Sequence, residues 1–420
     1  MKRHILIIIT LFSTYVGFAS DAYLRGGVTL QAKQNVIQVE IAYELSRPDT
    51  SSTLSFLLAR NCQISFITGK VVERYASDTT TRPERTIIVH LSANRNKAEP
   101  VTIYFSYLVP FDSSRFADEG FIELGLDWFW FPVHPSISQW DLAFDLKVST
   151  SDASLSVFSN GKADQQAATE YRVRSVHPGF DVDLFFLRDA KVYAPKSKSV
   201  IIAGNADNPP LKDSIAEVTA SYLEWYNNYY STGINNVTCV FRPRSKNPIP
   251  FGYARAGYFV LSEPPKLADV KFYIAHEVGH LWFRHGEPTL NAWLTESLAE
   301  YNAMLLTRYT EGVPAFDSII ADKRARINRV TQAGKVLPAV HNNGSKGKSI
   351  LAQMSLYHKG PLVLYALEQR IGASAMQKVL REVYHSKASS TAQFLTILEQ
   401  HTDKATRMMM ADELEATTGK

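Results

Sequence analysis

Short alternating and β-branched runs dominate the chain up to about residue 193. The clearest of them cover residues 36–41, 86–91, 101–105, 140–148 and 154–158, with turn-rich stretches such as 46–50 and 93–96 between them. Successive side chains of a strand point to opposite faces of its sheet, so alternation of this kind indicates half-buried strands. Short strands at this spacing predict a β-sandwich or a large open sheet.

Beyond residue 193 the hydrophobic positions recur mainly at helical spacing. A segment rich in Asn and Pro at 205–210 marks the change. We predict helices at 212–230, 266–285 and 292–309, strands at 237–241 and 254–261, and a mostly helical end from 351 to 401 with breaks at Gly360-Pro361 and Gly372. A β-rich half is therefore followed by an α-rich half that contains a small sheet.

The first 19 residues are typical of a secretory signal peptide. Lys2 and Arg3 precede an apolar stretch, and Gly17 and Ala19 are the small residues that signal peptidase requires. The alternative is an uncleaved anchor, but about 15 apolar residues are too few to span a bilayer comfortably. We predict cleavage near Ala19, a mature chain without a transmembrane segment, and a secreted or periplasmic location.

Composition excludes several classes of protein. Of 420 residues, 45% are hydrophobic and 20% are charged, which is a globular balance rather than that of a disordered or fibrous chain. The chain has 45 basic and 41 acidic residues, and removing Lys2 and Arg3 leaves 43 against 41, or about +2. A nearly neutral chain of this kind gives no reason to expect nucleic acid or an anionic membrane as a partner.

The two cysteines, Cys62 and Cys239, allow two interpretations. They could form one disulfide in an oxidising compartment, although they fall in segments that we assign to different domains. Two buried free thiols are an equally good interpretation. Two cysteines are also too few to make a zinc site of their own.

The aromatic run Trp128-Phe129-Trp130-Phe131 could be a binding platform, but packing in the core or between domains is the favoured interpretation. Such large side chains are more often buried than presented to a ligand. The run is therefore predicted to be structural.

An H-E-x-x-H element at residues 276–280 carries the clearest chemical signal. On a helix, residues i and i+4 share one face, so His276 and His280 can both reach one metal ion. Glu277 stands beside them, where it can take a proton from an attacking water. Apolar neighbours on both sides predict that the helix is buried.

A catalytic zinc needs a third protein ligand, and the next predicted helix offers Glu296. This carboxylate lies among apolar residues, where it is costly unless it is paired or binds a metal. His285 is the rival, but it lies five residues past His280 and off the shared face. Glu300, one turn after Glu296, either orients a ligating histidine or is a solvated helix charge.

These motifs resemble those of a known family, the gluzincin metallopeptidases of the aminopeptidase N type. HEVGHLWF at 276–283 and WLTESLAEY at 293–301 are similar to its HExxH helix and to its W-L-N-E-G-x-A-x-Y segment. Tyr357-His358-Lys359-Gly360 resembles its Y-x-K-G helix. The resemblance covers most of the chain. It implies a β-rich N-terminal domain at 20–193, a thermolysin-like zinc peptidase domain at 194–345, and a helical C-terminal part at 346–420.

Carried over position by position, the resemblance also assigns roles. It implies that His276, His280 and Glu296 bind one zinc ion per chain, that Glu277 is the general base, and that Tyr357 stabilises the oxyanion. The substrate would be a peptide.

Two departures from the family pattern bear on specificity. The interval between His280 and Glu296 is 15 residues, shorter than in the family, which implies a shorter loop between the two helices. The G-x-M-E-N strand, whose glutamate holds the substrate's amino group, has no counterpart, and residues 251–258 read FGYARAGY. Asp127 and Glu263 are the carboxylates that could replace it.

Three functions follow as hypotheses. Release of N-terminal residues from peptides leads, and a zinc endopeptidase is the second. A catalytically idle binding module is the third, although every ligand position and Glu277 are present.

Overall fold

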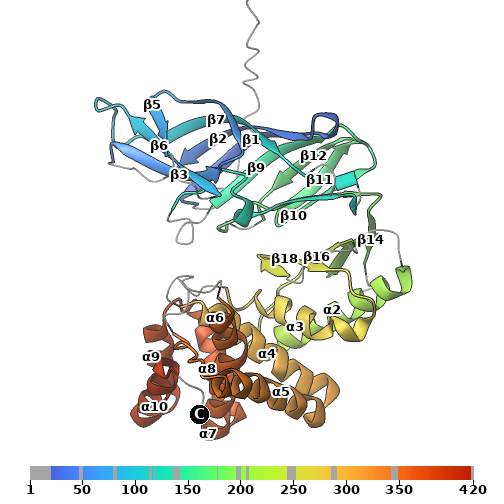
Figure 1. The fold of residues 1–420 in the computed structure, drawn as a ribbon, viewed down its shortest axis with the longest axis vertical. Coiled ribbons are helices and arrows are strands. Elements are labelled where there is room, and N and C mark those ends of the chain that lie inside the picture. The colour runs from blue at the N-terminus through green and yellow to red at the C-terminus, as the bar shows by residue number, and fades with distance from the viewer. Residues whose placement is uncertain are drawn as a thin grey trace, which may run out of the picture.

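The computed structural model describes residues 20–46, 51–78, 83–112, 116–117, 119–135, 142–176, 178–194, 200–204, 208–243, 252–284, 291–341 and 349–417. The predicted signal peptide at 1–19, the first part of the boundary segment 205–210, and His285 lie outside these ranges. Figure 1 shows a β-rich part above a largely helical part. The predicted order, a β-rich N-terminal domain followed by a helical C-terminal region, is confirmed.

Three sheets make up the described part of the N-terminal domain. The largest has the order β11 (Lys162–Ala167), β12 (Glu170–Arg174), β9 (Leu142–Thr150), β1 (Ala22–Gln31), β2 (Val36–Leu45), β7 (Val101–Pro110), β4 (Gln63–Thr68). The two smaller sheets are β3 (Thr53–Ala59), β6 (Glu84–Leu91), β5 (Val72–Ser77) and β10 (Leu155–Ser159), β13 (Leu184–Arg188), β8 (Phe121–Leu124). Most neighbouring strands are antiparallel, and β1 and β9 are parallel.

The alternation that predicted these strands corresponds to a sandwich core. In β2, every second residue from Ile37 to Leu45 is buried. Phe56 of β3 packs against Tyr43 of β2 and Phe105 of β7, with ring centroids 5.0 and 5.4 Å apart. Side chains from two sheets thus interdigitate in one core, as the sandwich prediction requires.

Most of the aromatic run is structural, as predicted. Trp130 and Phe131 are buried, and the Trp130 indole N–H donates to the carbonyl of Val182 at 2.9 Å. Trp128 is the exception, because 56% of it is exposed. The two cysteines are both buried and unbridged, which agrees with the free-thiol interpretation.

The C-terminal half has a sheet of its own. Its order is β14 (Lys191–Tyr193), β15 (Val200–Gly204), β16 (Val237–Arg242), β18 (Tyr258–Ser262), β17 (Tyr253–Arg255). Strands β15, β16 and β18 are parallel, and α2 (Pro209–Tyr230) connects the first two of them. The sheet begins at β14, just before the predicted domain boundary at 193. The bounds of the four domains stay predictions.

The predicted single strand at 254–261 is wrong in detail. The chain forms a hairpin there, in which β17 pairs antiparallel with β18. Gly257 has a φ of 69°, a left-handed conformation that suits glycine, and so it allows the tight reversal. The hairpin leaves β17 at one edge of the sheet.

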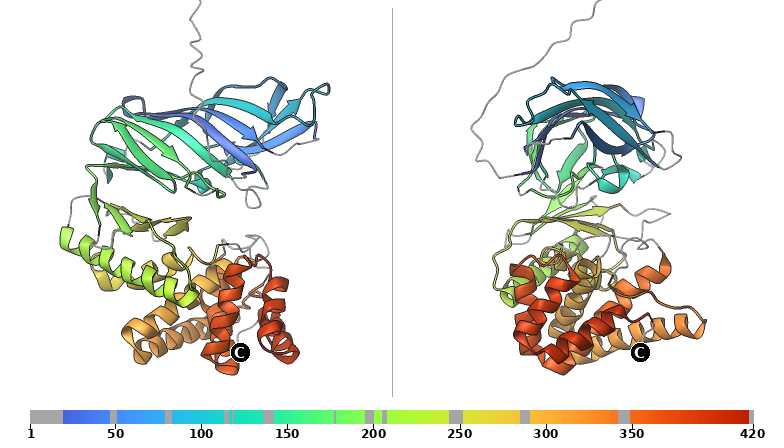
Figure 2. Two further views of the ribbon diagram at one scale, coloured as in Figure 1. Left: turned by 180° about the vertical axis from the view of Figure 1, so that it is seen from behind. Right: turned by 90° about the vertical axis from the view of Figure 1, so that its left-hand side faces the viewer.

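Helices build the rest of the molecule (Figure 2). They are α3 (Lys271–Gly279), α4 (Trp293–Glu311), α5 (Val313–Gln332), α6 (Ile350–Met354), α7 (Gly360–Ile371), α8 (Ala373–His385), α9 (Thr391–His401) and α10 (Lys404–Glu415). A π-helical segment, η6 (Ser355–Lys359), joins α6 to α7, and short 3₁₀ turns are η1 (Ala32–Gln34), η2 (Leu126–Trp128) and η4 (Leu267–Asp269). Among the described residues, no helix is both long enough and apolar enough to cross a bilayer.

Two helix predictions need correction. The helix predicted at 266–285 is shorter, because η4 precedes it and residues 280–282 form turns after its last residue, Gly279. The break predicted at Gly360-Pro361 is not a break. The helical path continues through η6 into α7, where Pro361 lies in the first turn, a position that tolerates a missing N–H. The predicted break at Gly372 is confirmed, with a φ of 83°.

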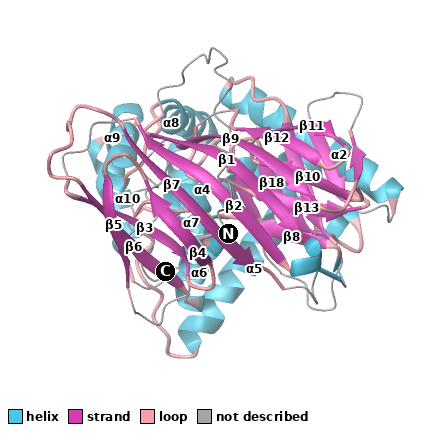
Figure 3. Ribbon diagram, turned by 90° about the horizontal axis from the view of Figure 1, so that it is seen from above, coloured by secondary structure: helices cyan, strands magenta, loops and turns pink. Residues whose placement is uncertain are grey.

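The two halves of the molecule contact each other through an apolar cluster and a neighbouring ion pair. Phe121, Phe185 and Leu187 of the N-terminal domain form one apolar cluster with Val240 and Val260 of the C-terminal half's sheet. Beside it, the Arg242 guanidinium donates to both carboxylate oxygens of Glu123, at 2.6 and 2.7 Å. Figure 3, seen from above, shows the strands of the N-terminal domain spread over the helices.

Candidate active site

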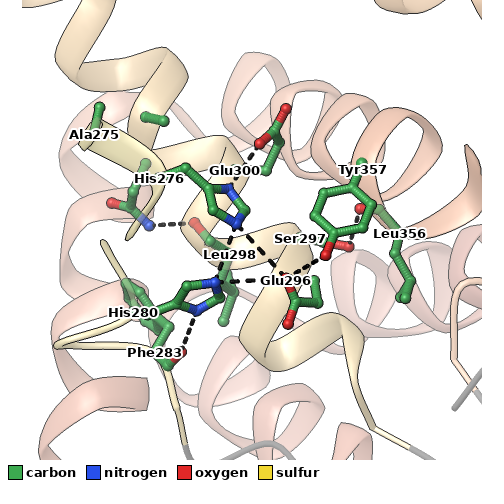
Figure 4. A network of polar contacts seen from close by, with 12 residues as sticks. Ala275, His276, His280, Phe283, Glu296, Ser297, Leu298, Glu300, Leu356 and Tyr357 are labelled. Carbon is green, nitrogen blue, oxygen red and sulfur yellow. Dashed lines mark hydrogen bonds and ion pairs between the residues drawn. The ribbon is translucent and has the colours of Figure 1, made fainter. Parts of the chain in front are cut away.

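Helices α3 and α4 bring three predicted ligands together (Figure 4). His276 and His280 lie one turn apart on α3 and its C-terminal end, and Glu296 lies in the first turn of α4. The Nε2 atoms of the two histidines are 3.1 Å apart. That of His276 lies 3.6 Å from Glu296 Oε2, and that of His280 lies 3.5 Å from it. Within the described residues, this trio is the group whose ligand atoms could hold a metal ion.

The other nitrogen of each imidazole is already engaged. His280 Nδ1 lies 3.3 Å from the carbonyl oxygen of Phe283, and His276 Nδ1 lies 2.8 Å from Glu300 Oε2. The second contact is short, although its direction is poor for a hydrogen bond. Both partners only accept hydrogen bonds, so the neutral rings carry their protons on Nδ1. The two Nε2 lone pairs then face each other.

This arrangement fits zinc. Two nitrogen ligands of a tetrahedral zinc stand about 3.3 Å apart when each bond is about 2.0–2.1 Å, close to the spacing of the two Nε2 atoms. Two lone pairs at 3.1 Å repel each other unless a proton or a metal cation lies between them. Two imidazoles and a carboxylate are also a donor set that catalytic zinc sites use. His276, His280 and Glu296 would hold the ion.

Buried charges shift the pKa values of these groups. Burial alone would lower the pKa of His276, but contacts with Glu296 and Glu300 outweigh it and raise the pKa to about 10. Burial would raise the pKa of Glu296, but the neighbouring His280 and His276 hold it well below its usual value. A cation between these groups must therefore displace a proton from His276, so metal binding should release a proton.

Glu277 has the surroundings of a general base. It is 6% exposed, and its Oε2 has no hydrogen-bond partner among the described residues. Burial raises its pKa above the ordinary value, while the charges of His276 and His280 act in the opposite direction. A buried carboxylate with a raised pKa and an unused oxygen is suited to accept a proton during a reaction.

Tyr357 reaches the same place from η6. Its hydroxyl donates to Glu296 Oε2 at 2.8 Å, and its ring centroid lies 5.7 Å from that of His276. Burial and the Glu296 carboxylate raise its pKa well above the usual value, so the phenol stays protonated and can donate. Segments wound as π-helix often occur at functional sites.

The residues after Tyr357 have structural roles. Lys359 is buried and donates to the carbonyl of Ala416. Gly360 lies against α4, where a Cβ would come within 2.1 Å of Ser297 Oγ. The Ser297 hydroxyl in turn donates to the carbonyl of Leu356 at 2.7 Å. A side chain at position 360 would therefore separate the helix that carries Glu296 from the segment that carries Tyr357.

Glu300 and Lys323 extend the site behind the ligands. The interpretation of Glu300 as an orienting carboxylate fits its contact with His276, and it is buried rather than solvated. Burial would raise its pKa, but the charge of Lys323 and the contact with His276 lower it to about 2. Lys323 is not among the residues predicted from the sequence. Its burial could have been predicted from its position on the apolar face of α5, in line with Phe316, Ile320 and Ile327.

A cavity of about 670 Å³ lies between the two halves of the molecule. Trp128, Asp127 and Glu123 line it from the N-terminal domain, and Gly252 and Arg255 line it from the C-terminal half. Gly252 connects it to the site, because a Cβ there would lie 2.7 Å from Glu277 Oε1. The cavity thus comes close to Glu277 at Gly252.

Of the two carboxylates suggested for a substrate amine, only Asp127 is available. Glu263 forms a buried ion pair with Lys212 at 2.9 Å. Asp127 is exposed and lines the cavity. Arg255 does not stand unpaired, since its Nε donates to Asp181 at 2.6 Å.

Comparisons with known proteins agree with this architecture. No protein-family model matches the chain, and no curated protein matches it in sequence. A structure of leukotriene A4 hydrolase from Saccharomyces cerevisiae aligns with a TM-score of 0.75 at 14% identity, over 95% of this chain and 68% of that one. An M1 zinc metallopeptidase from Deinococcus radiodurans aligns with a TM-score of 0.69 at 15% identity, over 95% and 93%. A point mutant of that enzyme, bound to a Tyr-Ser-Ala substrate, gives 0.70 at 16%, over 95% and 94%. At these identities the likeness is one of fold, and the chain has a divergent form of the M1 metallopeptidase fold.

Proposed function

We propose that this protein is a zinc-dependent peptidase that hydrolyses peptide bonds. The observation that carries the proposal is the convergence of His276, His280 and Glu296 beside the buried Glu277 and the Tyr357 hydroxyl. The M1-type fold supports it, since neighbours of that fold are zinc metallopeptidases. The signal peptide predicted at 1–19 would direct the proposed activity outside the cytoplasm.

The residues of this chain divide the reaction between them. When bound, zinc supplies Lewis-acid polarisation of the scissile carbonyl and makes water more acidic. Glu277 accepts the proton of the attacking water and passes it to the leaving amine. Tyr357 donates to the carbonyl oxygen as negative charge develops there. Its hydroxyl already stands beside Glu296, so it only has to change acceptor.

Metal removal tests the proposal directly. The purified protein should hold about one zinc per chain and cleave a peptide mixture. A chelator should stop the cleavage, and added zinc should restore it. Metal analysis and mass spectrometry of the products provide the readouts. Full activity without metal would overturn the proposal, as would a zinc-loaded protein that binds peptides and cleaves none.

Release of N-terminal residues is the finer form of the proposal, and it rests on the sequence resemblance. Such an enzyme has to hold the substrate's ammonium with a carboxylate. Among the carboxylates that line the cavity, Glu123 is held by Arg242 through two hydrogen bonds, and we propose the exposed Asp127 as the acceptor. Internal cleavage is the second candidate. It is favoured by the absence of a counterpart to the G-x-M-E-N strand at residues 251–258, which read FGYARAGY.

A matched pair of peptides, one free and one N-acetylated, separates the two candidates. We expect the free peptide to be preferred, and Asp127→Asn to reduce that preference about tenfold, the value of one charge-assisted hydrogen bond. The ratio of the two kcat/KM values is the measurement. Asp322→Asn, which changes an exposed carboxylate on α5, is the control. Internal cleavage of the acetylated peptide would replace the first candidate with the second.

A further inference from the structure

One buried lysine links the metal-binding side of the site to the segment that presents Tyr357. Lys323 is 3% exposed, and its ammonium donates both to Glu300 Oε1 and, at 2.9 Å, to the backbone carbonyl of Tyr357. Its Nζ also lies 5.6 Å from the centroid of the Phe272 ring on α3. A charge is costly to bury, so a lysine held in this way requires the partners that it contacts.

The contact with the Tyr357 carbonyl follows from Pro361. In a regular helix, the carbonyl of residue 357 would accept from the N–H of residue 361, four positions later. Proline has no N–H, so this partner is missing. A buried carbonyl without a partner costs free energy, and Lys323 supplies the donor from α5. Lys323 therefore donates to the Tyr357 carbonyl, where Pro361 has no N–H to offer.

The other contact of Lys323 leads to the metal side. Its ammonium holds Glu300 Oε1, while Glu300 Oε2 lies 2.8 Å from His276 Nδ1. Glu300 thus contacts a predicted ligand with one oxygen and Lys323 with the other. The same ammonium also holds the backbone of Tyr357. Lys323 therefore connects the segment that carries the Tyr357 hydroxyl to Glu300, and through Glu300 to His276.

From these contacts we infer that Lys323 is a positioning residue, which sets the Tyr357 hydroxyl against the metal ligands and fixes Glu300 on His276. This inference rests on the proposed function. Lys323 touches neither the ligand atoms nor the reacting bond, so it acts through Glu300 and through the backbone of Tyr357. A displacement of Tyr357 by a fraction of an ångström would weaken the contact that it makes with the developing oxyanion.

The test compares Lys323→Met with the same change made in a Tyr357→Phe protein. Alone, Lys323→Met should lower kcat about 10- to 100-fold with KM changed less than about threefold, the effect of a misplaced group. It should also weaken zinc affinity about 10- to 100-fold, as loss of an outer partner of a ligand does. In the Tyr357→Phe background, it should lower kcat less than about threefold, since the hydroxyl it positions is gone. Equal losses in both backgrounds would show a merely structural role and overturn the inference.

Pro361→Ala keeps the test valid if Lys323→Met does not fold. Alanine restores an N–H that competes with Lys323 for the Tyr357 carbonyl, and it leaves every charge in place. We expect kcat to fall about tenfold while zinc affinity stays within about threefold of the parent. Arg326→Met, which removes an exposed cation from the same helix, is the control for both variants. An unchanged kcat in Pro361→Ala would contradict the inference.

The two proposals fail in different ways. If the zinc-loaded parent cleaves no peptide, the proposed function fails. Zinc affinity then still tests Lys323, because Lys323→Met should weaken it and Pro361→Ala should not. If the parent is active and the losses are additive, only the inference about Lys323 fails.

Discussion

Glu277→Gln should lower kcat by about 10²- to 10⁴-fold, the usual contribution of a general base, and leave the zinc content unchanged. Glutamine has the same shape but cannot accept the proton of the attacking water. Glu277 is not one of the three residues whose ligand atoms converge, so the metal should stay bound. Glu277 Oε2 also has no hydrogen-bond partner among the described residues, so a neutral amide loses no contact there. The free energy of unfolding should stay equal or rise, since a buried carboxylate is replaced by a neutral group.

Single-turnover and steady-state kinetics of the zinc-loaded variant provide the measurement, with metal analysis beside them. Glu311→Gln is a matched control, because Glu311 is an exposed carboxylate at the end of α4, paired with Lys271 at 3.2 Å. It should keep both the zinc and the turnover of the parent. If Glu277→Gln turned over peptide at the parental rate, another group would have to be the base.

Two kinds of site residue can be predicted from the sequence: residues that a single helix brings together, and residues whose chemistry is unusual for their surroundings. His276 and His280 are four residues apart, so the helix alone places them on one face. Glu296 stands out because a carboxylate among apolar residues needs a partner, and in the structure it contacts both histidines and Tyr357. Tyr357 comes only from the family resemblance, since no local pattern marks a tyrosine 61 residues away from its partner.

Sequence reasoning misses Lys323 because a lysine on an amphipathic helix is usually solvated. The partners of this one lie 23 and 34 residues away in the sequence. Gly360-Pro361 predicts a break because proline cannot continue the hydrogen-bond ladder. The ladder is instead completed from another helix, and that contact cannot be inferred from the segment alone. The burial of Lys323 and the continuous helical path through Pro361 are explained together only when the contact between α5 and η6 is known.

The same distinction applies to the fold. Alternation over residues 36–41 predicts the first part of β2 (Val36–Leu45), because one face of that strand is buried throughout. The hairpin of β17 and β18 is predicted as one strand, because its two-residue turn, Ala256-Gly257, interrupts the apolar run only briefly. Local pattern thus predicts elements well where burial repeats, and poorly where a single backbone conformation reverses the chain.

Glu296→Ala should lose most of its zinc and, with it, the hydrolysis of every peptide that the parent cleaves. The variant retains His276 and His280, but two imidazoles without the carboxylate leave a zinc site one protein ligand short. Equilibrium dialysis against a zinc buffer measures the loss. Tyr357→Phe is the matched control, because it removes the other half of the 2.8 Å hydrogen bond and keeps the ligand. That protein should keep its zinc while kcat falls roughly 10²- to 10³-fold, the usual cost of one oxyanion donor. Full zinc occupancy in Glu296→Ala would show that another residue completes the site, and His285 would be the first to exchange.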